Sequence, residues 1–332
     1  MKKFINSPFH VEDEMVDGFV SACGGKIRRS DKFRVVVRTD RQNTQKVGVI
    51  SGGGSGHEPA ILGYVGKGML DAVAVGDIFS SPPPGAFLEA IHAVDTGQGV
   101  LIIIGNYTGD RMNIHIAMDI AKTEGRNVAL VITDDDVGSG KNDRRGVAGE
   151  FFVWKTSGAM AEQGGTLEEC VRIAELTNSH CRTLGVAIAP CTVPAKGTPT
   201  FTLRDDEMEY GVGHHGERGM ENIKLQPVDR IVERMVAEII DDLPFKAGDD
   251  IAVMVNGLGG TANCELFIIY RKVKQILDEI GINIYMNFIG EYFTALEMAG
   301  FSISMLKLNN ELKTLLTTPS SSWAFRNHAC FD

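Results

Sequence analysis

Residues 99–133, GVLIIIGNYTGDRMNIHIAMDIAKTEGRNVALVIT, contain the pattern that decides the fold. The apolar runs at the two ends, GVLIII and NVALVI, each have the length and composition of a buried strand. Between them Met112, Ile116 and Ile120 recur at helical spacing, and Gly125 suits the position that closes a helix. A strand, a polar loop, a helix and a second strand in this order predict a parallel sheet covered by helices.

The same alternation extends along the chain in both directions. KVGVI at 46–50 predicts a strand that ends in a glycine-rich loop. Further strands are predicted at 184–190, 200–203, 251–256, 282–290 and 302–308, and further helices at about 159–176, 228–241, 262–280 and 291–300. The stretch 191–224 is rich in Gly, Thr, Pro and charge, which predicts a boundary between a domain at 1–190 and a domain at 191–332.

The composition is typical of a globular protein. The chain has 332 residues and a formal charge of −10, and 43% of its residues are hydrophobic, which excludes a wholly disordered chain. The acidic balance argues against direct binding of nucleic acid, which requires a basic face. No run of 18 apolar residues and no secretory signal is present, so we expect a cytoplasmic protein that does not enter a membrane.

The cysteines carry no metal or redox pattern. No CxxC pair and no CxxC…HxxxH zinc spacing occurs, so the cysteines are interpreted as small apolar residues with reduced thiols. The six are Cys23, Cys170, Cys181, Cys191, Cys264 and Cys330. The sequence therefore predicts no metal site in this chain.

SGGGSGHEP at 51–59 is the strongest local motif. Four glycines directly after a strand let backbone N–H groups approach a polar ligand without hindrance from Cβ atoms. No GxGxxG fingerprint can be laid over the motif, and no GxxxxGK[ST] loop occurs in the chain, so no nucleotide cofactor is predicted. His57 stands where a helix would begin and is predicted to face the ligand. The alternative is a flexible turn with a solvated histidine.

Two further loops place polar side chains near predicted strands. In NYTGD at 106–110, Asp110 can accept a proton from a substrate hydroxyl, although Asn, Gly and Asp also favour plain turns and helix caps. In GVGHHGERG at 211–219, His214 and His215 are neighbours, and a neutral imidazole can be a nucleophile, a base or a metal ligand. Because adjacent side chains diverge, we expect only one of the two histidines to face a site.

Together these motifs resemble the dihydroxyacetone kinase DhaK family, the dihydroxyacetone-binding subunit. The resemblance runs in family order over nearly the whole chain, through SGGGSGHEP, GYVGKGMLDA, NYTGD, RRGVAGE, CTVP, DDEMEYGVGHHGERG, NGLGGT and GEYFTALEMAG. It implies an α/β fold with two domains (DhaK/DegV-like): an N-terminal three-layer domain with a parallel sheet, and a C-terminal domain with a mixed sheet that carries the ligand-binding histidine. It also implies a homodimer, and a nucleotide module that lies outside this chain.

The resemblance implies covalent binding, in which a histidine holds the ketone of dihydroxyacetone as a hemiaminal. Matching GVGHHGERG to the family's GIGIHGEPG places this histidine at His215, with His214 in place of an apolar residue. The same matching implies Gly54 as a backbone contact, His57 as an acid–base partner and Asp110 as the base that faces the terminal hydroxyl. Only a carbonyl forms the adduct, so glycerol is rejected, and the adduct positions the hydroxyl for phosphoryl transfer.

Four further positions depart from the family pattern. Gly105 stands where the family usually has a lysine, which removes a positive charge where phosphoryl charge would develop. Ile61 replaces a histidine, Arg218 a proline and Glu150 a threonine. The residues that bind dihydroxyacetone are kept, whereas neighbours suited to phosphoryl transfer or to docking of the nucleotide subunit are changed.

The chain is therefore similar in character to DhaQ, a DhaK-like coactivator paralogue that binds dihydroxyacetone and acts with a TetR-type regulator. The expected function is a dihydroxyacetone sensor that partners such a regulator of the dihydroxyacetone kinase operon and has lost catalysis. The alternative is the dihydroxyacetone-binding subunit of a phosphotransferase-system-dependent kinase. Its partner would then be a DhaL-type nucleotide-binding subunit.

Overall fold

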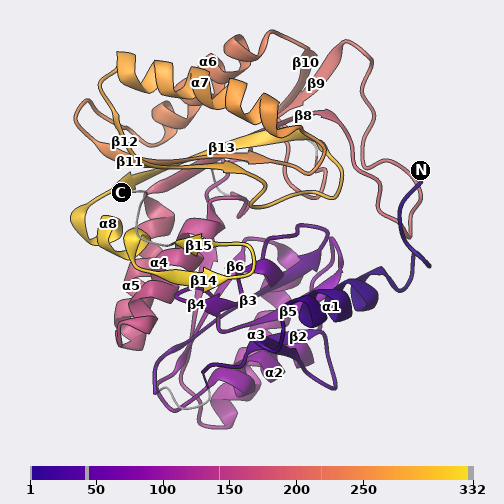
Figure 1. The fold of residues 1–332 in the computed structure, drawn as a ribbon, viewed down its shortest axis with the longest axis vertical. Helices are drawn as coiled ribbons and strands as arrows, with labels where there is room; N and C mark the ends of the chain where they lie inside the picture. The colour runs from indigo at the N-terminus through magenta and orange to yellow at the C-terminus, as the bar shows by residue number, and fades with distance from the viewer. Residues whose placement is uncertain (1, 42–44, 142, 218, 328–332) are drawn as a thin grey trace. The chain divides into compact units, whose positions relative to one another are not determined.

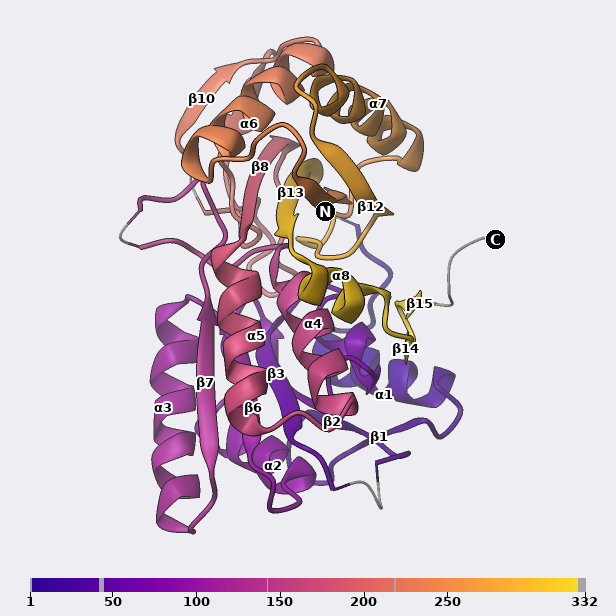
Figure 2. The ribbon, with the colours of Figure 1, turned by 90° about the vertical axis from the view of Figure 1, so that its left-hand side faces the viewer.

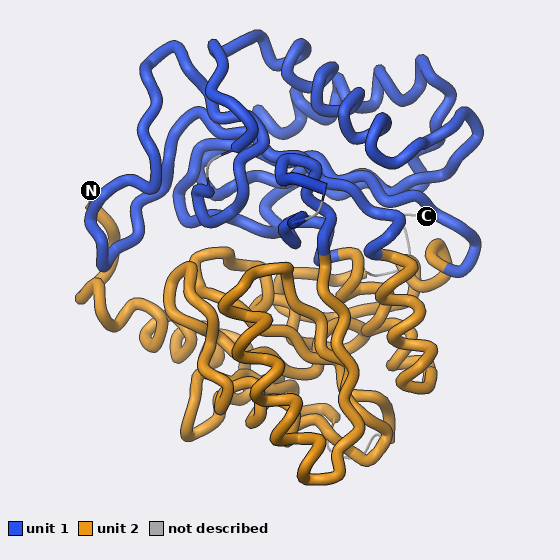
Figure 3. Tube along the Cα trace, turned by 180° about the vertical axis from the view of Figure 1, so that it is seen from behind, with its two compact units in different colours: residues 1, 134–151, 178–311 blue, residues 2–133, 152–177, 312–332 orange. Residues whose placement is uncertain are grey.

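The chain forms two compact units. The computed structural model describes residues 2–41, 45–141, 143–217 and 219–327. Figure 3 colours the two units, of which unit 1 holds residues 134–151 and 178–311, and unit 2 holds residues 2–133, 152–177 and 312–332. In the described residues no helix is both long and apolar enough to cross a membrane.

This division differs from the predicted boundary between residues 190 and 191. β8 (Cys181–Ala189) pairs with β13 (Ala299–Leu308), which joins it to unit 1. Near the end of the chain, β14 (Ser320–Ser322) pairs with β4 (Gly66–Lys67) and belongs to unit 2. Pairing between strands far apart in the sequence decides which unit they join, and a change of composition along the chain does not report such pairing.

Unit 2 is built on a six-stranded sheet whose inner strands are parallel. In spatial order the strands are β1 (Ile27–Arg29), β2 (Val35–Arg38), β5 (Ala72–Ile78), β3 (Gly48–Ser55), β6 (Val100–Gly105) and β7 (Val128–Thr133). β5, β3, β6 and β7 pair in parallel, while β1 and β2 add an antiparallel edge. The strands predicted from KVGVI, GVLIII and NVALVI are confirmed as β3, β6 and β7.

Helices cover both faces of this sheet. The helices that lie wholly or mostly in unit 2 are α1 (Val11–Ala22), α2 (Pro84–Val94), α3 (Thr108–Thr123), α4 (Glu150–Glu162), α5 (Leu167–Ser179) and α8 (Asn310–Thr317), with a 3-10 turn at Leu62–Tyr64. α8 packs on α4 and α5 through Leu315. Apolar side chains of α2 and α3 pack on the sheet, and Figure 2 shows α3 on one side of β7 and α5 on the other. The predicted three-layer arrangement is therefore confirmed.

Two details of the helix prediction differ from the structure. The single helix predicted at 159–176 is two helices, α4 and α5, because Gly164 between them has a left-handed backbone (φ +86°). On α3, Met112, Ile116 and Ile120 lie on the exposed face, and the buried face is formed by other residues, among them Ile114.

Unit 1 is built on a second six-stranded sheet, which is mixed. Its strands are, in spatial order, β10 (Glu221–Lys224), β9 (Glu207–Tyr210), β8, β13, β11 (Asp250–Gly257) and β12 (Asn283–Gly290). Only β11 and β12 pair in parallel. The strands predicted at 184–190, 251–256, 282–290 and 302–308 are confirmed as β8, β11, β12 and β13, and with them the two-domain α/β fold class.

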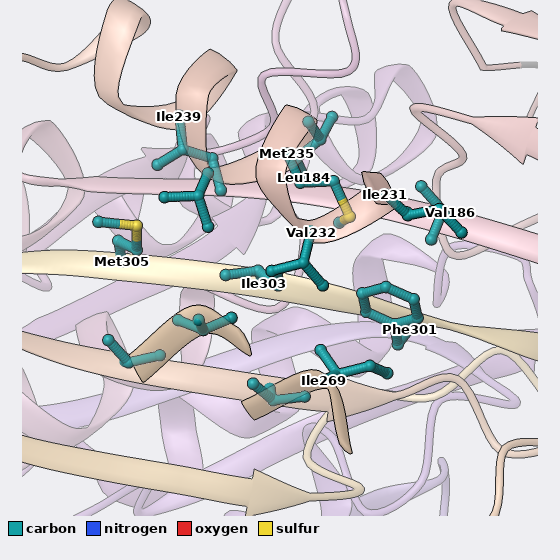
Figure 4. Close-up of a cluster of buried hydrophobic side chains, with 14 of the residues drawn as sticks. Leu184, Val186, Ile231, Val232, Met235, Ile239, Ile269, Phe301, Ile303 and Met305 are labelled. Atoms are coloured by element: carbon teal, nitrogen blue, oxygen red, sulfur yellow. The ribbon is translucent and has the colours of Figure 1, made fainter. Parts of the chain in front are cut away.

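Helices α6 (Val228–Asp242) and α7 (Asn263–Glu279) cover one face of this sheet (Figure 1). They match the helices predicted at 228–241 and 262–280. Figure 4 shows how α6 packs: Val232, Met235 and Ile239 lie against Leu184 of β8 and Ile303 of β13. All of these side chains are buried, so this layer forms the hydrophobic core of unit 1.

Two predicted elements of unit 1 do not form. Residues 291–300, predicted as a helix, are turns that lead into β13. The Asn256 side chain accepts the backbone N–H groups of Tyr292 and Phe293 at 2.8 and 2.9 Å, and Leu296 has a left-handed backbone (φ 54°), so this backbone cannot form a helix. The strand predicted at 200–203 is also absent, and the adjacent strand is β9.

A small third sheet completes unit 2. It consists of β15 (Arg326–Asn327), β14 and β4 in that order. Its strands come from residues near 66 and from residues near 325, so the last described part of the chain is held in unit 2.

Candidate functional site

The glycine-rich segment that ends β3 and continues into a loop is packed too closely for any other residue at Gly54, which is still part of the strand. A Cβ atom there would lie 2.6 Å from the backbone nitrogen of Ser80 and 2.9 Å from Cα of Phe79. His57 follows in the same loop and is only 2% exposed. Its imidazole stacks on the Phe79 ring, with the ring centroids 4.9 Å apart and 18° between the planes. His57 is therefore a buried and oriented side chain, not a solvated one.

Asp110 lies at the end of the neighbouring strand. β6 is hydrogen-bonded to β3, and Asp110 falls in the first turn of α3, which follows β6. The side chain is buried, and the first turn of a helix stabilises a carboxylate through the helix dipole. The Asn113 side chain of α3 donates hydrogen bonds to Ser81 Oγ (3.1 Å) and Pro82 O (3.0 Å), which ties α3 to the segment that follows Phe79.

Gly54, His57 and Asp110 thus all lie at the carboxyl ends of two adjacent parallel strands. This is the edge at which parallel α/β sheets bind ligands. Gly105, the position of the missing family lysine, is the buried last residue of β6 and pairs with Thr133 of β7. The loops of unit 2 therefore bring three of the predicted site residues to one edge of one sheet.

The fourth predicted residue, His215, belongs to unit 1 and is hydrogen-bonded to Glu217. The Nδ1 atom of His215 lies 2.7 Å from Oε1 of Glu217, and the backbone N–H of His215 donates to Oε2 at 2.9 Å. Burial works to raise the pKa of Glu217, but the hydrogen bond and the charge of His215, with help from Arg145, outweigh it and lower the pKa to about 2. Glu217 is therefore a carboxylate at neutral pH.

An ionised carboxylate beside Nδ1 fixes the tautomer of the imidazole. It accepts a hydrogen bond, so Nδ1 must carry the proton and the lone pair of the neutral ring lies on Nε2. The His215 side chain is 21% exposed, which leaves the residue accessible to a small molecule. This is the arrangement that a nucleophilic or basic histidine requires.

Glycines and Arg145 hold the loop of His215 in shape. A Cβ on Gly213 would lie 2.3 Å from Oε2 of Glu217, so any larger residue there would push the carboxylate from its present position. Arg145 binds Asp136 at 2.6 Å and donates to the carbonyl oxygen of Gly211 at 3.0 Å. The RRGVAGE motif thus supports the histidine loop.

His214 has a different environment from that of its neighbour. It is 4% exposed and stacks on Phe293, with ring centroids 4.3 Å apart and 8° between the planes. The two histidine rings are nearly perpendicular, at 83°. The ring of His215 lies beside the Glu217 carboxylate, whereas the ring of His214 is stacked on Phe293, so the two histidines have different surroundings.

Sequence reasoning missed Glu217 and Arg145 as supporting residues. Both residues stand in motifs quoted above. The signal that could have identified Glu217 is a carboxylate two residues after a histidine in a glycine-rich loop. Among the departures from the family pattern, Ile61 is buried with a left-handed backbone (φ 62°) and Glu150 begins α4. Arg218 lies outside the described residues.

The fold and these loops define an α/β protein with a histidine and a carboxylate at a parallel sheet edge in one unit and a histidine–carboxylate pair in the other. The model of the Dak1 domain matches residues 17–324. The chain belongs to the Dak1 domain family.

Known relatives cover nearly the whole chain. The dihydroxyacetone-binding subunit DhaK of PTS-dependent dihydroxyacetone kinase 1 from Listeria innocua is 43% identical over 94% of this chain and 95% of its own. The DhaK subunit of the PEP-dependent kinase from Escherichia coli is 37% identical over 97% of this chain and 99% of its own. The solved structure of the dihydroxyacetone kinase operon co-activator DhaQ has a TM-score of 0.91 and 31% identity, over 96% of this chain and 99% of its own.

Proposed function

We propose that this chain binds dihydroxyacetone covalently, as a hemiaminal on Nε2 of His215. The observation that carries the proposal is the 2.7 Å contact between His215 Nδ1 and the Glu217 carboxylate. It directs the lone pair of the neutral ring to Nε2, the atom that would attack the ketone. The names of the DhaK relatives support the choice of ligand.

The reaction balances with groups of this chain. The lone pair of Nε2 forms a bond to the carbonyl carbon, the C=O π bond breaks toward oxygen, and that oxygen takes a proton from a general acid. Positive charge develops on the imidazole, and Glu217 stabilises it through the hydrogen bond at Nδ1. Glycerol has no carbonyl group and cannot follow this route.

We assign the remaining contacts from the family resemblance. In this proposal Gly54 offers its backbone to the ligand, His57 is the acid that protonates the ketone oxygen, and Asp110 accepts the hydrogen bond of a terminal hydroxyl. The burial of His57 and Asp110 supports such roles, because buried polar groups hold a small polar ligand in one orientation. No metal or organic cofactor enters the proposal.

The biological role that we propose is dihydroxyacetone sensing, as a coactivator of a TetR-type regulator of the dihydroxyacetone kinase operon. Its support is the likeness to DhaQ over nearly the whole chain, together with Gly105 and Ile61, which replace residues of the kinase pattern. The second candidate is the DhaK subunit of a phosphotransferase-system-dependent kinase, acting with a DhaL-type subunit. The identities of 37% and 43% to named DhaK subunits favour this candidate.

A paired substitution tests the covalent step. His215→Ala should abolish the adduct with excess dihydroxyacetone in intact-mass or crystallographic detection, and His214→Ala should retain it, because His214 is buried against Phe293. Glycerol is the negative control. An adduct that survives in His215→Ala, or that is lost only in His214→Ala, contradicts the assignment.

A reconstituted assay separates the two roles. The chain is mixed with a DhaL-type subunit that carries ADP and with its phosphocarrier, and dihydroxyacetone phosphate is measured. The sensing role predicts poor turnover that Gly105→Lys increases, since the lysine restores positive charge at the phosphoryl group. Turnover on the order of 1–100 s⁻¹ by the unmodified chain, as in kinases, would favour the kinase subunit.

Two further expectations belong to the proposal. The resemblance implies a homodimer, which light scattering of the purified chain measures directly. The chain is also expected to be cytoplasmic and to act on DNA only through its regulator, which a pull-down of the regulator with and without dihydroxyacetone can test.

A further inference from the structure

Unit 2 contains a cavity of about 470 Å³ that the proposed function does not use. Small-molecule sites are commonly about 300–1,000 Å³. The walls come from four parts of the chain: the turn between α1 and β1, the end of β2 with the two residues after it, the strand β4, and the hairpin of β14 and β15. Strand pairing holds the last two of these walls together, because Lys67 of β4 stands opposite Ser321 of β14.

Three exposed cations line this cavity: Lys26, Lys67 and Arg326. Among the residues that the structure describes, none of the three forms an ion pair within 4.0 Å. Asp40 is the one acidic residue of the described lining, and its carboxylate is taken by Arg38 at 2.6 and 2.9 Å. The cavity therefore keeps an excess of positive charge in a chain whose formal charge is −10.

The end of α1 does not account for this charge. A helix C terminus carries about half a negative charge, which one nearby cation offsets. Lys26 follows the last turn of α1 and can serve that purpose, whereas Lys67 and Arg326 come from other elements. The excess points to an anionic ligand with more than one negative charge.

Trp323 adds a flat apolar surface to the same cavity. It lies in the turn between β14 and β15 and is 56% exposed. Its ring meets Phe19 of α1 edge-on, with centroids 5.3 Å apart and 69° between the planes. A large aromatic side chain held by one neighbour and exposed to a cavity is suited to stack on a planar ring.

We propose that this cavity binds an organic phosphate that carries a planar ring. The phosphate contacts Lys26, Lys67 and Arg326, and the ring lies against Trp323. Lysine and arginine both bind phosphate oxygens, and the planar arginine fork does so with two parallel hydrogen bonds. The site is independent of the residues assigned to dihydroxyacetone.

The chain carries its own reporter for this proposal. It has two tryptophans, and the other, Trp154, is fully buried. Titration with AMP, which combines a phosphate and a planar base, should quench the fluorescence of Trp323 in a saturable manner. Adenosine lacks the charge and pyrophosphate lacks the ring, so each should bind at least about tenfold more weakly than AMP, as 1.4 kcal/mol corresponds to tenfold.

Substitutions assign the binding to this cavity. Lys26→Gln, Lys67→Gln and Arg326→Gln should each weaken AMP about threefold, the range of an exposed charge contact, and the triple variant more than tenfold. Lys122→Gln, an exposed lysine on α3, is the matched control and should bind as the unmodified chain does. Trp323→Phe should lose the fluorescence response while calorimetry still detects binding.

Three results would overturn the proposal. The first is unchanged AMP affinity in the triple variant. The second is quenching that persists in Trp323→Phe, which would place the ligand elsewhere. The third is citrate binding as tightly as AMP, which would show that any polyanion suffices. All substituted side chains are exposed, so circular dichroism should report an unchanged fold.

Discussion

Replacing Glu217 by glutamine tests whether a carboxylate prepares His215 for attack on a ketone. The amide has the same size and can still accept a hydrogen bond from Nδ1, but it has lost the negative charge. The pKa of Glu217 falls from 4.5 to about 2, which corresponds to about 3 kcal/mol in favour of the ionised form. The Glu217 side chain is 30% exposed, so solvent screens part of this energy.

The expected loss follows from the charged hydrogen bond. Such bonds contribute about 1.5–3 kcal/mol, so the dissociation constant of dihydroxyacetone should rise about 10- to 100-fold in Glu217→Gln. Isothermal titration calorimetry at neutral pH measures this constant. Glu279→Gln, the same charge change at the exposed end of α7, is the control and should leave the affinity unchanged.

The pH dependence gives a second readout of the same idea. Because the pKa of Glu217 is lowered to about 2, this carboxylate stays ionised in mild acid. A loss of adduct there therefore has a cause other than protonation of Glu217. If Glu217→Gln binds dihydroxyacetone as tightly as the unmodified chain while His215→Ala does not, the carboxylate has no part in preparing the histidine and the reasoning fails.

Three further predictions concern stability. Gly54→Ala should lower the free energy of unfolding by about 1–3 kcal/mol, because its Cβ would lie 2.6 Å from the nitrogen of Ser80. Gly140→Ala is the control and should not lower it, since a Cβ there meets no atom within 4 Å. Thermal melts compare the two variants. Burial lowers the pKa of Lys155 from 10.5 to about 8, so the unfolded chain holds this proton more tightly and stability should rise between those pH values in urea titrations. Lys155→Met should remove that rise. Arginine partners lower the pKa of Asp242 from 3.8 to about 2, so about 2 kcal/mol of stability should disappear as pH falls through this window. If an Asp242→Asn variant loses stability with falling pH as steeply as the unmodified chain does, Asp242 is not the group responsible.

The strands of the two sheets could be predicted from the sequence because they are buried. The run GVLIII is fully enclosed as β6, and such runs stay apolar on both faces. The helix expected at 291–300 failed for a reason that lies elsewhere in the chain. There the side chain of Asn256, which belongs to β11, takes the backbone N–H groups of Tyr292 and Phe293. A local pattern carries no information about such a distant partner.

The same limit applies to the site. Glycine-rich loops after strands indicated His57 and Asp110, since that position follows from the topology of a parallel sheet. The choice of His215 over His214 came from resemblance, and the structure adds a physical distinction between them. The partnership of His215 with Glu217 depends on a carboxylate that lies close against Gly213. Its geometry could not be derived from spacing.

The return of the chain to unit 2 has a consequence for synthesis on the ribosome. Strand β4 is made early, but its partner β14 follows all of unit 1 in the sequence. The Lys155 side chain donates a hydrogen bond to the carbonyl oxygen of Leu315 at 2.7 Å. This bond likewise cannot form until Leu315 has been translated. Unit 2 therefore cannot finish folding in the vectorial, N-terminal-first order that many multidomain proteins follow. Its small sheet closes only after unit 1 has been translated in full.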